Sequence, residues 1–129
     1  MKSKRTLLLI DNDEIPLSIA EYMLMDDYEV VTAKSGQDAL DILSKGLAPS
    51  LILLDIVMPG MDGWKTYARI RSIDAFHDVP ILFLTVLDEV KEKKYALEIG
   101  AADYITKPFS RKTLLEKVQS IIKEKYGDN

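Results

Sequence analysis

Short apolar runs, each followed by an amphipathic or charged stretch, constrain the fold of this chain more than any other feature. The runs have the length and residue types of buried strands, and we expect strands at residues 6–10, 29–33, 51–54, 80–85 and 103–106. Ile15, Ile19, Tyr22 and Met23 have the spacing of a helix, and further helices are expected at 35–45, 64–72, 88–99 and 110–126. Because strands and helices alternate, the pattern predicts an α/β fold with a parallel sheet covered on both faces.

Length and composition narrow the class of protein. The 129 residues are sufficient for one domain, expected to span 1–129 without an effector domain. A net charge of −4 argues against a surface that binds nucleic acid directly. The chain has no Cys and a single His, which excludes disulfides and thiolate metal sites and argues against a Ser-His-Asp triad. The apolar run near the N-terminus stops at Ile10, too early for a signal peptide or a membrane span, so we expect a cytoplasmic protein with no membrane contact.

Polar side chains follow four of the predicted strands. They are Asp11, Asn12 and Asp13 after the first strand, Asp55 after the third, Thr85 at the end of the fourth and Lys107 after the fifth. Sites in sheets of this kind lie beyond the carboxyl ends of the strands, so we expect these side chains to meet. Converging carboxylates suit Mg²⁺, and a hydroxyl with an ammonium group suits phosphoryl oxygens. The set therefore predicts phosphoryl-transfer chemistry.

Four segments in this order, LLLIDNDE, LILLDIVMPGMDG, ILFLT and GAADYITKPF, resemble the receiver domain of two-component response regulators over essentially the whole chain. The resemblance implies a doubly wound, CheY-like sheet with strand order 2-1-3-4-5 and five flanking helices. It implies a protein that is not an enzyme beyond its own phosphorylation and dephosphorylation. A sensor histidine kinase or a histidine phosphotransfer protein would donate the phosphoryl group. A downstream protein would bind the face of the fourth helix, fifth strand and last helix, on a monomer or a weak phosphorylation-dependent dimer.

The resemblance also implies roles for the residues that accept the phosphoryl group. Asp55 would be the phosphoacceptor. Weakly bound Mg²⁺ or Mn²⁺ would be held by Asp11, Asn12, Asp55 and the backbone carbonyl of Val57. Asn12 stands where this family usually has an acid, so we expect a weaker metal site. Asp13 is an alternative metal ligand, although a role as N-cap of the first helix is favoured.

Other matching residues would sense the phosphoryl group. Thr85 would bind one of its oxygens, and Lys107 would pair with Asp55 before phosphorylation and with the phosphoryl group afterwards. Tyr104 would be the aromatic switch residue, which moves inward when Thr85 is drawn to the phosphate. The resemblance implies a cis peptide bond between Lys107 and Pro108.

Several side chains near these positions affect reactivity or loop shape. Val86 stands where this family usually has a small residue, so we expect its bulk to narrow the access of small phosphodonors to Asp55. Val57 and Leu87 stand at positions that, in the family this chain resembles, tune the attack of water on the acyl phosphate. Both are apolar and cannot orient a water, so we expect a phosphorylated state that lasts minutes or more. Gly60 and Gly63 are interpreted as positions that need unusual backbone angles.

Two alternative functions remain open. Asp11 and Asp13 fit the opening of haloacid dehalogenase-like phosphatases, with Asp11 as the nucleophile, but the late acidic pair of that family is missing. A pseudo-receiver that binds partners without phosphorylation is favoured only by Asn12 and Val86. The position of the phosphoryl group decides between these functions. A receiver would carry it on Asp55, a phosphatase on Asp11, and a pseudo-receiver on neither residue.

Overall fold

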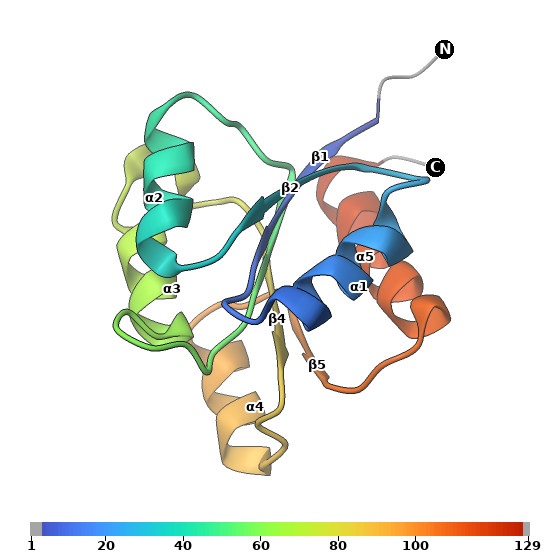
Figure 1. Ribbon diagram of the computed structural model, residues 1–129. Helices are drawn as coiled ribbons and strands as arrows, with labels where there is room; N and C mark the ends of the chain where they lie inside the picture. Colours follow the sequence, from blue (N-terminus) through green and yellow to red (C-terminus); the bar gives the residue numbers. More distant parts are fainter. Residues whose placement is uncertain (1–3, 128–129) are drawn as a thin grey trace.

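Five parallel strands in the order β2-β1-β3-β4-β5 form the centre of the computed structural model, which describes residues 4–127 (Figure 1). The strands are β1 (Thr6–Ile10), β2 (Glu29–Ala33), β3 (Leu51–Leu54), β4 (Ile81–Thr85) and β5 (Asp103–Thr106). The α-helices are α1 (Glu14–Leu24), α2 (Gly36–Ser44), α3 (Gly63–Arg71), α4 (Val90–Glu98) and α5 (Arg111–Tyr126). The predicted doubly wound α/β fold and its strand order are confirmed.

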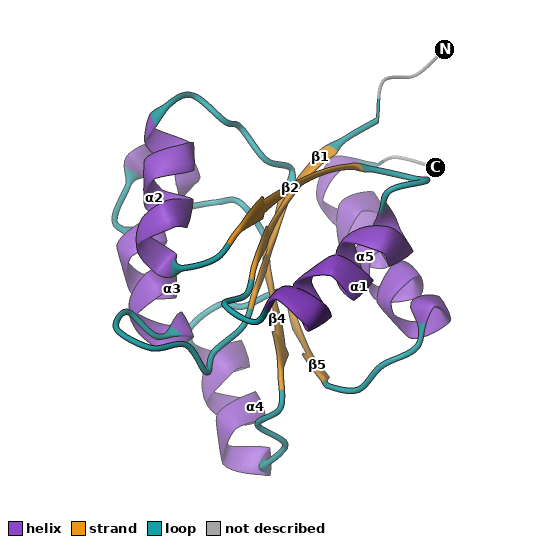
Figure 2. Ribbon diagram, in the orientation of Figure 1, coloured by secondary structure: helices purple, strands orange, loops and turns teal. Residues whose placement is uncertain are grey.

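Helices cover both faces of the sheet. Figure 2 shows α1 and α5 on one side of the strands and α2, α3 and α4 on the other. Successive strand residues point to opposite faces, so Leu7 and Leu9 pack towards α1 and α5, and Leu8 and Ile10 pack towards the other layer. The central strands β1, β3 and β4 are buried from both sides, so nearly every residue in them is apolar, and they are recognisable in the sequence as short apolar runs. The edge strands β2 and β5 are only partly buried and carry polar residues.

Helix boundaries follow the capping residues in the sequence. Asp13, Ser35, Asp62 and Ser110 are N-caps whose side chains accept a hydrogen bond from the first turn of their helices. Helix α4 begins two residues later than predicted and has no side-chain cap. A 3₁₀ helix, η1 (Asp74–Phe76), was not predicted. Within residues 4–127, no helix has both the length and the apolar character needed to cross a membrane.

Of the four residues whose spacing predicted helix α1, only Met23 packs against the core, where it is partly buried. Ile15, Ile19 and Tyr22 are 72%, 49% and 71% exposed. The buried residues of α1 are Leu17, Ala20 and Leu24. This helix has apolar residues on two sides, and its spacing identifies a helix without deciding which side packs against α5 and the sheet.

Candidate functional site

The polar residues that follow β1, β3, β4 and β5 meet at the carboxyl edge of the sheet. Backbone hydrogen bonds continue one position beyond the strands: the Asp11 N–H donates to the Ala33 carbonyl at 3.1 Å, and the Asp55 N–H donates to the Ile10 carbonyl at 3.0 Å. The Lys107 N–H donates to the Thr85 carbonyl at 2.8 Å. These residues therefore stand at the carboxyl end of the sheet. The side chains of Asp11, Asp55 and Lys107 come together there as predicted, whereas Asn12 and Asp13 are exposed.

A partly buried lysine bridges the two buried carboxylates of this site. Lys107 Nζ lies 2.5 Å from Asp11 Oδ2 and 3.6 Å from Asp55 Oδ2. The Asp11 and Asp55 side chains are only 6% and 8% exposed. The predicted pairing of Lys107 with Asp55 is present, but the shorter contact is with Asp11. Burial raises the pKa of Asp55 above its usual value, Lys107 acts to lower it, and the nearby Asp11 charge acts to raise it.

The β1–α1 loop holds Asp11 in place. The Asp13 N–H donates to Asp11 Oδ1 at 3.0 Å, and Asp13 Oδ1 in turn accepts the Ile15 N–H at 3.3 Å as the N-cap of α1. The structure therefore confirms Asp13 as a helix cap. Asn12, between the two acids, is exposed.

The donor set can be compared with the needs of a metal ion. Among residues 4–127, no three or more Asp, Glu, His or Cys side chains are grouped so that they could hold a metal ion. The site has two carboxylates, Asp11 and Asp55, that face one ammonium group. Its other predicted ligands, the Asn12 amide and the Val57 carbonyl, are neutral oxygens. Mg²⁺ commonly binds through one or two carboxylates and keeps several waters, so this set fits a weakly held Mg²⁺.

The Leu87 backbone connects Thr85 to Tyr104. The Leu87 N–H donates to Thr85 Oγ1 at 3.4 Å, and the Tyr104 hydroxyl donates to the Leu87 carbonyl at 2.6 Å. Thr85 is fully buried and Tyr104 is 8% exposed. Burial, with smaller effects from the charges of Glu92, Asp88 and Asp55, raises the pKa of Tyr104 to about 12, so it remains a hydrogen-bond donor at neutral pH. The role of Leu87 could not be predicted, because every residue offers the same backbone groups.

Helix α3 begins against the backbone that carries Asp55. The Gly63 N–H donates to the Ile56 carbonyl at 2.8 Å. A Cβ atom at Gly63 would lie 2.3 Å from the Asp55 carbonyl oxygen and 2.4 Å from Ile56 Cα. The predicted unusual backbone angle is found at Gly60, with φ of +73°, whereas Gly63 is required for space.

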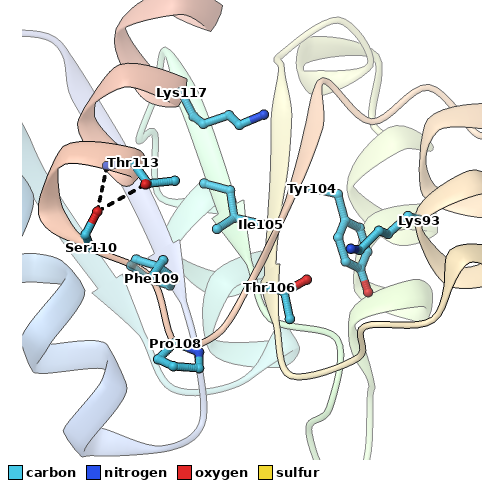
Figure 3. A pocket seen from close by; sticks show the side chains of 9 residues that line it. All are labelled: Lys93, Tyr104, Ile105, Thr106, Pro108, Phe109, Ser110, Thr113 and Lys117. Carbon is cyan, nitrogen blue, oxygen red and sulfur yellow. Dashed lines mark hydrogen bonds between the residues drawn. The ribbon is translucent and has the colours of Figure 1, made fainter.

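An open pocket of about 400 Å³ lies on the surface predicted to bind a downstream partner (Figure 3). It is lined by Lys93, Tyr104, Ile105, Thr106, Pro108, Phe109, Ser110, Thr113 and Lys117. In Figure 3, Tyr104 and Lys93 lie on the α4 side and Lys117 on the α5 side. The bond between Lys107 and Pro108 is cis, as predicted. Tyr104 thus contributes both to this pocket and to the hydrogen bond with Leu87.

Comparisons with known proteins agree with this arrangement. A family model described as "Response regulator receiver domain" matches residues 7–119. The "Probable transcriptional regulator ycf27" of Porphyra purpurea is 40% identical over 121 residues, which cover 93% of this chain and 48% of the relative. The protein of the same name from Guillardia theta is 36% identical over 124 residues, which cover 95% of this chain and 47% of that relative. The chain thus spans about half the length of these curated relatives.

Solved structures share the fold. The Vibrio cholerae chemotaxis protein CheY4 superposes with a TM-score of 0.86 at 29% identity, covering 92% of this chain and 99% of that one. The receiver domain of the Francisella response regulator 1452 superposes with a TM-score of 0.84 at 26% identity, covering 94% of this chain and 98% of that one.

Proposed function

The chain belongs to the response regulator receiver domain family, and we propose that Asp55 is its phosphoacceptor. The observation that carries this proposal is the buried cluster at the carboxyl edge, where Lys107 bridges the carboxylates of Asp55 and Asp11. A single ammonium group in contact with two carboxylates suits a phosphoryl group that arrives with several negative oxygens.

The reaction follows from the groups present. A carboxylate oxygen of Asp55 attacks the phosphorus of a phosphohistidine on a partner kinase or phosphotransfer protein. The O–P bond forms as the N–P bond breaks, and the imidazole leaves with the electron pair and takes up a proton. Bound Mg²⁺, held by Asp11, Asp55, the Val57 carbonyl and Asn12, would neutralise charge on the phosphoryl oxygens. Lys107 and the Thr85 hydroxyl would then contact the transferred group.

The proposed output is a change at the face formed by α4, β5 and α5. Thr85 Oγ1 accepts the Leu87 N–H, so movement of the Thr85 hydroxyl towards the phosphoryl group removes that contact. The Leu87 carbonyl holds the Tyr104 hydroxyl, and Tyr104 lines the pocket in Figure 3. A partner that binds one arrangement of this pocket better would respond to phosphorylation.

The test is to locate the phosphoryl group. Wild type, Asp55→Asn and Asp11→Asn are treated with a phosphorylated histidine kinase or with acetyl phosphate in Mg²⁺ and mapped by mass spectrometry. We expect label on Asp55, and no labelled species for Asp55→Asn. Asp78→Asn, which removes a carboxylate paired with Lys125 outside this site, is the matched control and should be labelled. Label on Asp11 would identify a phosphatase-like enzyme, and no label from either donor would identify a pseudo-receiver; both outcomes contradict the proposal.

A further inference from the structure

We infer that Lys107 and the metal ion compete for Asp11, so that metal binding must first displace the lysine from this carboxylate. The inference rests on the proposed function, because it concerns the metal site beside Asp55. Its starting point is the asymmetry of the bridge: the ammonium group is 2.5 Å from Asp11 Oδ2 and 3.6 Å from Asp55 Oδ2.

Both oxygens of Asp11 have partners in this state. Oδ1 accepts the Asp13 N–H at 3.0 Å, and Oδ2 contacts Lys107 Nζ. A carboxylate oxygen has lone pairs for a second partner, but two cations that share one oxygen lie within a few ångströms of each other and repel strongly in a poorly solvated site. The Lys107 side chain is only 15% exposed, so water screens this repulsion little. A divalent ion on Asp11 therefore requires the ammonium group to leave.

Asn12 makes this competition more severe. The cluster of Asp11, Asp55 and Lys107 has a net charge of −1 when both carboxylates are ionised, whereas an acid at position 12 would make it −2. The internal cation thus offsets half of the negative charge that would attract the metal.

Isothermal titration calorimetry with MgCl₂ tests the inference through binding alone. We expect Lys107→Met to bind Mg²⁺ about tenfold or more tightly than wild type, because the interaction of two charges a few ångströms apart exceeds the free energy of a tenfold change. The matched control is Lys125→Met, which removes the same charge from an ion pair with Asp78 in the last turn of α5, at the opposite edge of the sheet. This control should bind Mg²⁺ as wild type does.

Each result decides the matter. Equal or weaker binding by Lys107→Met, or an equal gain in both variants, overturns the inference. If wild type shows no binding, appearance of binding only in Lys107→Met supports it, and no binding in either overturns it.

NMR of the wild-type lysine side chains provides a second measurement if Lys107→Met does not fold. The ε-carbon signal of Lys107 should shift during the Mg²⁺ titration while that of Lys125 stays constant, and an unchanged Lys107 signal overturns the inference. Failure of the proposed function is seen separately, as loss of label from Asp55.

Discussion

Replacing Asp55 by Asn should stabilise the folded protein, although it removes one partner of an ion pair. The Asp55 carboxylate is buried, and its pKa is raised mainly because burial disfavours the charged form. Its attraction to Lys107 is opposed by repulsion from Asp11, which holds the same ammonium group at shorter range. Asn has nearly the shape of Asp and avoids the cost of a buried charge.

The size of the effect follows from these opposing contributions. At 3.6 Å, and with an effective dielectric constant of about 20, Lys107 attracts the Asp55 carboxylate by about 4–5 kcal/mol. Repulsion from the Asp11 charge cancels much of this attraction. Removing a carboxylate from water costs several kcal/mol. We therefore expect the free energy of unfolding of Asp55→Asn to exceed that of wild type by about 1–2 kcal/mol at pH 7.

Urea denaturation in the presence of EDTA measures this difference. The matched variant is Asp11→Asn, which removes the 2.5 Å contact and leaves Lys107 with only the 3.6 Å partner. We expect it to lower the free energy of unfolding by about 2 kcal/mol. The reasoning would be refuted if both substitutions raised the free energy of unfolding equally, or if Asp55→Asn lowered it.

The pH dependence provides a further check. The pKa of Asp55 is higher in the folded than in the unfolded protein, so the folded state binds the proton more tightly. Wild type therefore loses stability relative to Asp55→Asn as the pH rises from the unfolded pKa of about 4 through the higher folded pKa. The excess free energy of unfolding of Asp55→Asn over wild type, expected at pH 7, should disappear below about pH 4.

Three other predictions concern the residues around Asp55. Asn12→Asp should tighten Mg²⁺ binding in calorimetry, because it restores a charged oxygen ligand; no gain would place this side chain outside the metal ligands. Gly63→Ala should lower the free energy of unfolding by about 2–3 kcal/mol in urea and slow the labelling of Asp55, because its Cβ would meet the backbone of Asp55 and Ile56; wild-type labelling would contradict this. The phosphorylated protein should retain its label for minutes without a phosphatase, because Val57 and Leu87 cannot orient a water. Loss within seconds on phosphate-affinity gels would exclude that explanation.

Much of the fold was predictable because burial from both sides leaves a clear signal. A strand such as Leu51–Leu54 must be apolar at every position, and helix ends such as Ser35 and Ser110 need side chains that accept backbone hydrogen bonds. The convergence of Asp11 and Asp55 was predictable because parallel strands deliver their carboxyl ends to one edge.

Contacts that depend on backbone groups or on exact distances were not predictable. The Leu87 backbone links Thr85 to Tyr104 with groups that any residue would offer. Gly63 is required because the start of α3 lies against the backbone of Asp55 and Ile56, just after β3. No local sequence pattern shows that these two segments touch.

The sequence by itself determined the alternation of strands and helices, the capped helix starts and the set of residues at the carboxyl edge, because these depend on local hydropathy, capping and strand direction. The tertiary structure alone decided that α1 buries Leu17, Ala20 and Leu24. It leaves Ile15, Ile19 and Tyr22 exposed, although their spacing helped to predict the helix. It also decided that Lys107 lies closer to Asp11 than to Asp55. Both outcomes depend on how separate elements pack against each other. A difference of about an ångström between the distances from Lys107 to the two carboxylates leaves no trace in the local sequence.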